Sequence, residues 1–202
     1  MLGLALIGTV GGAIGGAREI VDLFDGSSKG DTQTETAVRV SPSELKLAKN
    51  SRYGFSFEYP VTWERRDPIN GDGLAAAGPE PGLELVAYGA LPSAGPSPAD
   101  VFNRLEYLVG QLADGTHARL VEAPNQQNVT RILPGGETTE MAGSRFVIVR
   151  PPVEGVPEVT SVVLATTTRE RDVTMRCSVP TRQYEQWRGA CNQFLSTLTL
   201  TR

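Results

Sequence analysis

The stretch YGFSFEYPVTWE, residues 53–64, constrains the fold more than any other part of the chain. Four aromatic rings recur at every second position, which is the period of a β-strand: Tyr53, Phe55, Phe57 and Tyr59. Pro60 has no N–H to donate and ends the regular pattern, and Trp63 follows on a second extended run. The pattern predicts a strand with an aromatic face turned to the core. An aromatic platform for a ligand is the alternative.

Further elements are predicted from apolar periodicity. Strands are expected over residues 82–91, 117–123, 128–134 and 144–152, and a hairpin over 161–179 with its turn at Arg169 to Asp172. A helix is expected from the capping residue Ser97 to Gly115. A second helix is expected over 181–198, with one apolar stripe formed by Tyr184, Trp187, Cys191, Phe194 and Leu198.

The two cysteines of the chain fall on predicted core positions. The second arm of the hairpin turns alternate residues to opposite faces, Val173, Met175, Cys177 and Val179 to one and Thr174, Arg176 and Ser178 to the other. Cys191 lies on the apolar stripe of the following helix. A disulfide between Cys177 and Cys191 would clamp this helix to the sheet, and two buried free thiols are the alternative.

Three regions are expected along the chain. Residues 1–24 form an apolar, Gly-rich membrane anchor or signal segment, because Met1 to Ala17 carries no charge. Residues 25–43 are rich in Gly, Ser, Thr and Asp and are expected to be a flexible linker. Residues 44–202 are expected to form the folded domain.

A glycine-zipper pattern lies inside the apolar segment. Gly8, Gly12 and Gly16 recur every fourth residue, so on a helix they share one face and allow another backbone to approach closely. Self-association of this segment in a membrane is one interpretation, and the ordinary composition of an export segment is the other.

Composition excludes several functional classes. The net charge of −4, with 23 acidic and 19 basic residues and no basic stripe, argues against nucleic-acid binding. His117 is the only histidine, so multi-histidine metal sites are excluded, and no catalytic or phosphate-binding signature is present. We expect no catalytic residues, no cofactor and no metal. Glu137, Glu140, Glu154 and Glu158 are carboxylates near predicted turns, which we expect to be solvated loop charges, with a site for a divalent cation as the alternative. The surviving enzymatic alternative is a hydrolase-like site that uses such loop carboxylates with His117.

The aromatic stretch resembles the opening motif of the Mog1/PsbP-like family, Y-G-[FY]-x-[FI]-x-[YF]-P-x-x-W. It is matched here by Tyr53, Gly54, Phe55, Phe57, Tyr59, Pro60 and Trp63. The order of the predicted elements over about residues 46 to 202 is similar as well. The resemblance implies an α+β fold, an α/β/α sandwich with a central antiparallel sheet. The matched positions build the fold, so no functional residue is carried over.

The resemblance also implies a function class, since characterised members of this family are accessory or binding proteins without an active site. With the apolar N-terminal segment, it suggests a bacterial exported or membrane-anchored domain that binds a protein or an envelope component outside the cytoplasm. A membrane assembly protein driven by the glycine zipper is a further alternative, besides the hydrolase.

Overall fold

The computed structural model describes residues 37–68, 70–92 and 117–201, which belong to one compact unit, Glu35–Arg202. The apolar segment with Gly8, Gly12 and Gly16 lies outside the described residues, and so does the predicted helix from Ser97 to Gly115. None of the described helices is long and apolar enough to cross a membrane.

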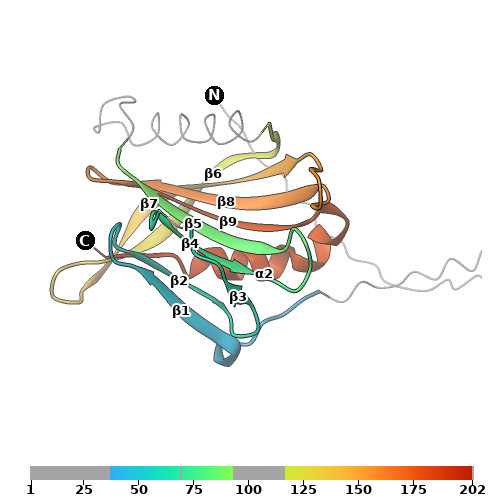
Figure 1. Cartoon of the computed structure of the whole chain (residues 1–202). Helices are drawn as coiled ribbons and strands as arrows, with labels where there is room; N and C mark the ends of the chain where they lie inside the picture. The colour runs from blue at the N-terminus through green and yellow to red at the C-terminus, as the bar shows by residue number, and fades with distance from the viewer. Residues whose placement is uncertain (1–36, 69, 93–116, 202) are drawn as a thin grey trace, which may run out of the picture. The chain divides into compact units, whose positions relative to one another are not determined.

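The strands of the described residues form one sheet, in the order β1-β2-β10-β6-β7-β8-β9-β5-β4-β3 (Figure 1). They are β1 (Leu45–Asn50), β2 (Phe55–Pro60), β3 (Glu64–Arg65), β4 (Gly73–Ala77), β5 (Glu84–Ala90), β6 (Arg119–Ile132), β7 (Thr138–Arg150), β8 (Val159–Thr167), β9 (Asp172–Pro180) and β10 (Thr199–Thr201). Neighbouring strands are antiparallel except β10 and β6, which are parallel.

Three helical elements are described: the short 3-10 helices η1 (Pro42–Glu44) and η2 (Thr181–Gln183), and the α-helix α2 (Tyr184–Ser196). The sheet curls around α2, which lies between the β1–β2 end and the β8–β9 strands in Figure 1. A curled, mostly antiparallel sheet with a helix packed on it confirms the predicted α+β fold. The prediction of a second helical layer depends on the helix expected from Ser97 to Gly115, which lies outside the described residues.

The inner face of the sheet, which we define as the face that packs on α2, carries the main core. The register places Leu85 of β5 and Val162 of β8 on either side of Cys177 of β9. These residues and the helix residues Cys191, Phe194 and Leu195 belong to one buried cluster. The predicted alternation of β9 and the predicted apolar stripe of α2 therefore meet in this core.

The outer face, opposite α2, carries a smaller apolar cluster and a row of polar side chains. Phe146 and Ile148 of β7 and Val163 and Ala165 of β8 form the apolar cluster, and all four are buried. The polar row begins at the next outward positions of the same strands. Its residues are described below, because they form the candidate site.

The aromatic stretch differs from its prediction at its first residue. Phe55, Phe57 and Tyr59 lie on β2 and are buried in the main core, but Tyr53 lies in the turn before the strand. Gly54 has a φ of 57°, a left-handed conformation that interrupts the extended chain after Tyr53. Tyr53 therefore belongs to the alternating aromatic pattern of the sequence but lies before the first residue of the strand.

Strand β6 also corrects the prediction of two short strands over 117–123 and 128–134. It is one strand of 14 residues, and its pairing with β7 shifts register twice, between Leu120 and Glu122 and between Glu122 and Asn125. Pro124 lies in this irregular part, where a missing N–H is tolerated. The bulges allow one strand to continue through a sequence whose pattern predicts two strands.

The predicted linker, residues 25–43, has its last part in contact with the domain. The backbone N–H of Val38 donates to the carbonyl of Gln186 at 2.9 Å. The side chain of Gln193 donates to the carbonyl of Val40 at 3.0 Å. Residues around Val38 and Val40 thus pack along α2, before the first strand begins at Leu45.

Candidate functional site

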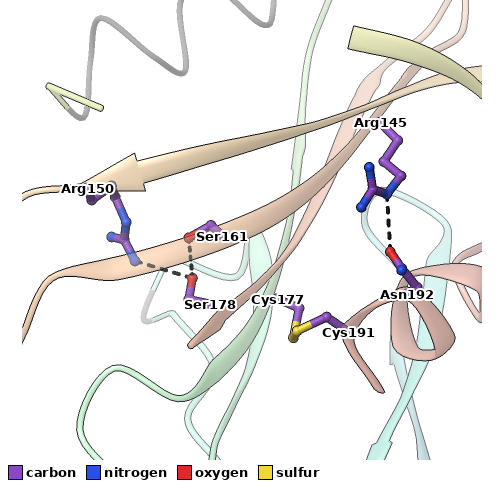
Figure 2. The surroundings of a disulfide bond; sticks show 7 residues. All are labelled: Arg145, Arg150, Ser161, Cys177, Ser178, Cys191 and Asn192. Carbon is purple, nitrogen blue, oxygen red and sulfur yellow. Dashed lines mark hydrogen bonds between the residues drawn. A yellow bond between two sulfur atoms is a disulfide. The ribbon is translucent and has the colours of Figure 1, made fainter. Parts of the chain in front are cut away.

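Cys177 and Cys191 form a disulfide that joins β9 to α2 in the middle of the main core (Figure 2). Their Cα atoms are 5.4 Å apart, and both residues are fully buried. The bond closes a chain segment with a sequence separation of 14 residues, which limits the freedom of the unfolded chain. Its role is structural, and its burial keeps it away from solvent.

The aromatic residues of the motif fill the core and leave no ligand platform. The ring of Trp63 lies 5.9 Å from that of Trp187 and 5.8 Å from that of Phe194, both on α2. The ring of Phe57 contacts that of Tyr59 edge to face at 6.4 Å. Since these rings are buried by the helix, the core interpretation of the pattern holds.

Tyr53 and Gly54 connect β2 to its neighbours. The ring of Tyr53 lies against Gly89 of β5, where a Cβ atom would overlap it. The carbonyl of Gly54 accepts a hydrogen bond from the N–H of Thr201 at 2.7 Å. Both contacts bring distant strands together, so these motif positions make the fold and do not form a site.

The outer face carries the most unusual polar group of the described residues. We call it the arginine cluster and define it as Glu84 of β5, Arg150 of β7, Ser161 of β8, and Arg176 and Ser178 of β9. Arg176 donates to Glu84 Oε1 at 3.0 Å, and Arg150 donates to the same oxygen at 3.4 Å. Two guanidinium groups therefore share one oxygen of one carboxylate.

The hydroxyl groups of the cluster are buried beneath the charged groups. Ser161 and Ser178 share a hydrogen bond of 2.8 Å, and both residues are fully buried. Arg150 also donates to Ser178 at 3.3 Å (Figure 2). The cross-strand register explains the arrangement, because Ser178 lies opposite Ser161 on one side and opposite Glu84 on the other.

The electrostatics of the cluster leave a surplus of positive charge. Burial lowers the pKa of Arg150, the nearby charge of Arg176 lowers this pKa further, and the carboxylate of Glu84 opposes both effects. The Nε atoms of Arg150 and Arg176 are buried and have no hydrogen-bond acceptor. One carboxylate thus serves two cations, and two buried donors remain unused by the described residues.

A hollow of about 320 Å³ opens beside Arg176, and we call it the alanine hollow. Its charged lining consists of Arg66, Glu84 and Arg176. Its remaining walls are apolar or aromatic and consist of Pro68, Ala75, Ala76, Ala77, Val86 and Tyr88. Small side chains on β4 next to larger ones on β5 and β9 explain why the outer face is recessed here.

A second pocket, of about 250 Å³, lies on the other side of the cluster at the end of β7. It is lined by His117, Arg150, Pro151, Val153, Val156, Pro157 and Val159. His117 has a φ of 50°, which is uncommon for a residue other than glycine. The lining includes no carboxylate, so this pocket does not pair His117 with any of the carboxylates proposed for a hydrolase.

The predicted carboxylates lie apart from each other in the sequence and the sheet. Glu140 lies on β7 and accepts a hydrogen bond from Asn128 of β6, and Glu137 lies in the turn before β7. Glu154 lies in the turn between Val153 and Val156, and Glu158 follows this turn. Among the described residues, no three His, Cys, Asp or Glu side chains lie close enough to hold a metal ion.

A separate polar group attaches α2 to the β6–β7 hairpin. Arg145 donates to Glu122 at 2.8 Å. It also donates to Asn192 of α2 at 3.1 Å, as Figure 2 shows. The hydrogen bond from Arg145 lowers the pKa of Glu122, and burial opposes this effect. Burial raises the pKa of Tyr184, whose hydroxyl donates to Glu122 at 3.5 Å. Every polar group here has a partner, so the contact is structural.

The arginine cluster was not predicted from the sequence, although one of its signals is present there. The alternation of β9 places Arg176 and Ser178 on the face opposite Cys177, as predicted. An arginine at a central-strand position, away from the core, is the feature that could have drawn attention. Its partners Glu84 and Arg150 come from strands whose register the sequence does not reveal.

No protein-family model and no curated protein matches the chain. The fold is similar to the solution structure of cyanobacterial PsbP (CyanoP) from Synechocystis, with 12% identity and a TM-score of 0.53, over 82% of this chain and 97% of that one.

Two further solved structures are more distant. A protein from Bacteroides thetaiotaomicron is 14% identical with a TM-score of 0.43, over 79% of this chain and 49% of that one. A protein of unknown function from Pseudomonas aeruginosa is 13% identical with a TM-score of 0.42, over 76% of this chain and 95% of that one. The likeness to CyanoP shows that the chain has the PsbP/Mog1-like fold.

Proposed function

We propose that this protein is a non-enzymatic accessory domain that works outside the cytoplasm and binds a partner protein through the outer face of its sheet. The observation that carries this proposal is the arginine cluster with its adjoining hollow. A recessed surface with surplus positive charge can hold a partner's charged group. The PsbP-like fold supports the same function class, because the characterised members of the family that the chain resembles are accessory or binding proteins.

The chemistry of the cluster is suited to binding. Its guanidinium groups carry a permanent charge, and their donors are arranged in a rigid fork. Its serine hydroxyls bond each other and Arg150, and no histidine or cysteine belongs to the cluster. The cluster therefore presents charge to a partner without a base positioned to activate a nucleophile.

The proposed compartment rests on the disulfide and on the N-terminal segment. Structural disulfides persist in oxidising compartments and are rare in the cytosol. The bond between Cys177 and Cys191 is buried between a helix and a sheet, as a structural disulfide is. The apolar segment from Met1 to Ala17 would export the domain or tether it to a membrane, and its glycine zipper would allow self-association there.

The location can be tested by intact mass spectrometry without reductant, on protein recovered from the membrane and soluble fractions of the native host. The proposal predicts a chain lighter by the two thiol hydrogens lost on oxidation, and accessible to added protease when the outer barrier is opened. A full-length chain with both thiols free in the cytosolic fraction would overturn the proposed compartment.

A further inference from the structure

The arginine cluster is short of one negative charge. Arg150 and Arg176 are both largely buried, with side chains 23% and 24% exposed, and both bond the same oxygen of Glu84. Partly buried charges are stable only when they are paired. One cation of the pair therefore remains without a counter-charge of its own within the described residues.

The hollow beside Arg176 provides a place for that counter-charge. Its charged side is formed by Glu84 and Arg176, and Arg66 lies at its rim, where its guanidinium bonds Glu64 at 2.6 Å. The lining also includes Tyr88, which is 41% exposed although its strand, β5, has a neighbouring strand on each side. An exposed aromatic ring beside a buried guanidinium is a typical feature of a protein-binding surface.

We propose that the alanine hollow binds a carboxylate group of an acidic, extended segment of a partner protein, held by Arg176, the arginine of the cluster that lines the hollow. This inference rests on the proposed binding function and names the chemistry of its ligand. The segment places one acidic side chain against Arg176 and packs a neighbouring apolar side chain on Val86 and Tyr88.

The charge of the site favours a carboxylate. A carboxylate brings one negative charge, which equals the surplus of the cluster, and its two oxygens match the planar fork of a guanidinium. A phosphate dianion brings a second charge, which Glu84 repels. The apolar walls formed by Ala75, Val86 and Pro68 also suit a peptide, since free phosphate leaves them uncovered.

The test is a titration of the full-length protein with two matched peptides, acetyl-Asp-Leu-Asp-Phe-amide and acetyl-Asn-Leu-Asn-Phe-amide. The Nε–H groups of Arg150 and Arg176 are buried, and their signals can be followed by NMR. We expect a saturable shift of the Arg176 Nε–H signal with the acidic peptide and none with the amide peptide. Added salt weakens the binding.

Two variants remove the site in different ways. Arg176→Gln removes the charge and keeps a hydrogen-bond donor, and Ala75→Leu fills the hollow without changing any charge. Each variant should weaken the binding of the acidic peptide at least tenfold. Arg182→Gln, on the exposed surface of η2, has the same net charge as the first variant and should bind like the unchanged protein.

Three results would overturn the inference. The first is equal binding of the two peptides, and the second is unchanged binding of the acidic peptide by the folded Ala75→Leu variant. The third is displacement of the acidic peptide by inorganic phosphate at a concentration similar to that of the peptide, which would show an anion site without peptide specificity. The proposed function has a separate readout. If the acidic peptide fails to bind but the protein is exported, oxidised and still captures a partner, only this inference is lost.

Discussion

Arg176 bonds Glu84 diagonally across the β5–β9 pair, with 3.0 Å between Nη2 and Oε1. Glu84 is also bonded to Arg150, so the one carboxylate of the cluster is bonded to both of its arginines. Replacing it with glutamine leaves two neighbouring guanidinium groups without a counter-charge. We expect Glu84→Gln to lower the free energy of unfolding by about 1 kcal/mol, as partly exposed ion pairs contribute less than buried ones.

The same substitution should strengthen the binding of the acidic peptide, because the surplus charge at the hollow rises. Urea unfolding measures the first effect, and the NMR titration measures the second. Glu158→Gln, an exposed change of the same charge, is the matched control and should alter neither quantity. A Glu84→Gln protein that is less stable and also binds the peptide more weakly would contradict the proposed charge balance.

Loss of the disulfide should destabilise the domain. Replacing both Cys177 and Cys191 with alanine restores the freedom of a loop of about 15 residues, worth roughly 3 kcal/mol on the chain-entropy model. The comparison is urea unfolding of the oxidised protein and of the double variant, which introduces no unpaired thiol. Equal midpoints and slopes for the two proteins would show that the bond contributes nothing to stability.

Gly89 is required because Tyr53 occupies the space of its side chain. We expect Gly89→Ala to force the Tyr53 ring away from β5 and to destabilise the protein by about 1–3 kcal/mol, the cost of overpacking a core position. Thermal unfolding followed by near-ultraviolet circular dichroism measures the loss of stability and the displaced ring together.

Gly189 is the matched control for this substitution. It lies on α2, no atom is within 4 Å of the position of a new Cβ, and alanine favours a helix over glycine by about 0.5–1 kcal/mol. Gly189→Ala should therefore stabilise the protein. If both substitutions shift stability in the same direction, the contact between Tyr53 and Gly89 does not have the proposed role.

The pH dependence of stability should contain a contribution from Glu122. Its folded pKa is lowered, mainly by the hydrogen bond from Arg145, so the unfolded state binds the proton more readily. The stabilisation is therefore present above the ordinary pKa of 4.5 and is lost as the pH falls below it through the folded pKa.

Glu122→Gln should consequently cost stability at neutral pH and progressively less below about pH 4.5. The measurement is the urea midpoint of both proteins across this range. Since the Glu122 side chain is about one-third exposed, a difference well under that of the disulfide variant is expected. A difference that stays constant with pH would mean that Arg145 holds Glu122 through packing alone.

Several elements could be predicted from the sequence because local periodicity decides them. The alternation in β9 and the apolar stripe of α2 each contain a cysteine, and both cysteines point into the same core. The aromatic residues of β2 likewise show the strand period. In these segments burial and local pattern agree, so a short stretch of sequence is sufficient.

Other strands have no such pattern. Three of the five residues of strand β4 are alanine, which has little preference for a strand, and the place of β4 is decided by pairing with β5. Strand β10 has three residues and lies between β2 and β6, far away in sequence. The exposed lysines of β1 reveal an edge strand only when its partner is known.

The candidate site belongs to this second group. Glu84 and Arg150 approach Arg176 through pairings that join β5, β9, β8 and β7. Local sequence predicts the face on which Arg176 lies, but the neighbours on that face depend on the register of three strand pairs. Long-range register is a property of the whole fold, so the shared carboxylate could be found only in the structure.

We propose above that the outer face of the sheet contacts a partner outside the cytoplasm at the alanine hollow. The most direct test places a photo-crosslinking amino acid at Tyr88 of the full-length protein in its native host, with Leu47, an exposed position on β1, as the control. We expect a discrete adduct with an exported or membrane protein from Tyr88 and none from Leu47, and we expect the Tyr88 adduct to be lost with Arg176→Gln. Equal adducts from both positions, or an adduct at Tyr88 that survives Arg176→Gln, would contradict this proposal.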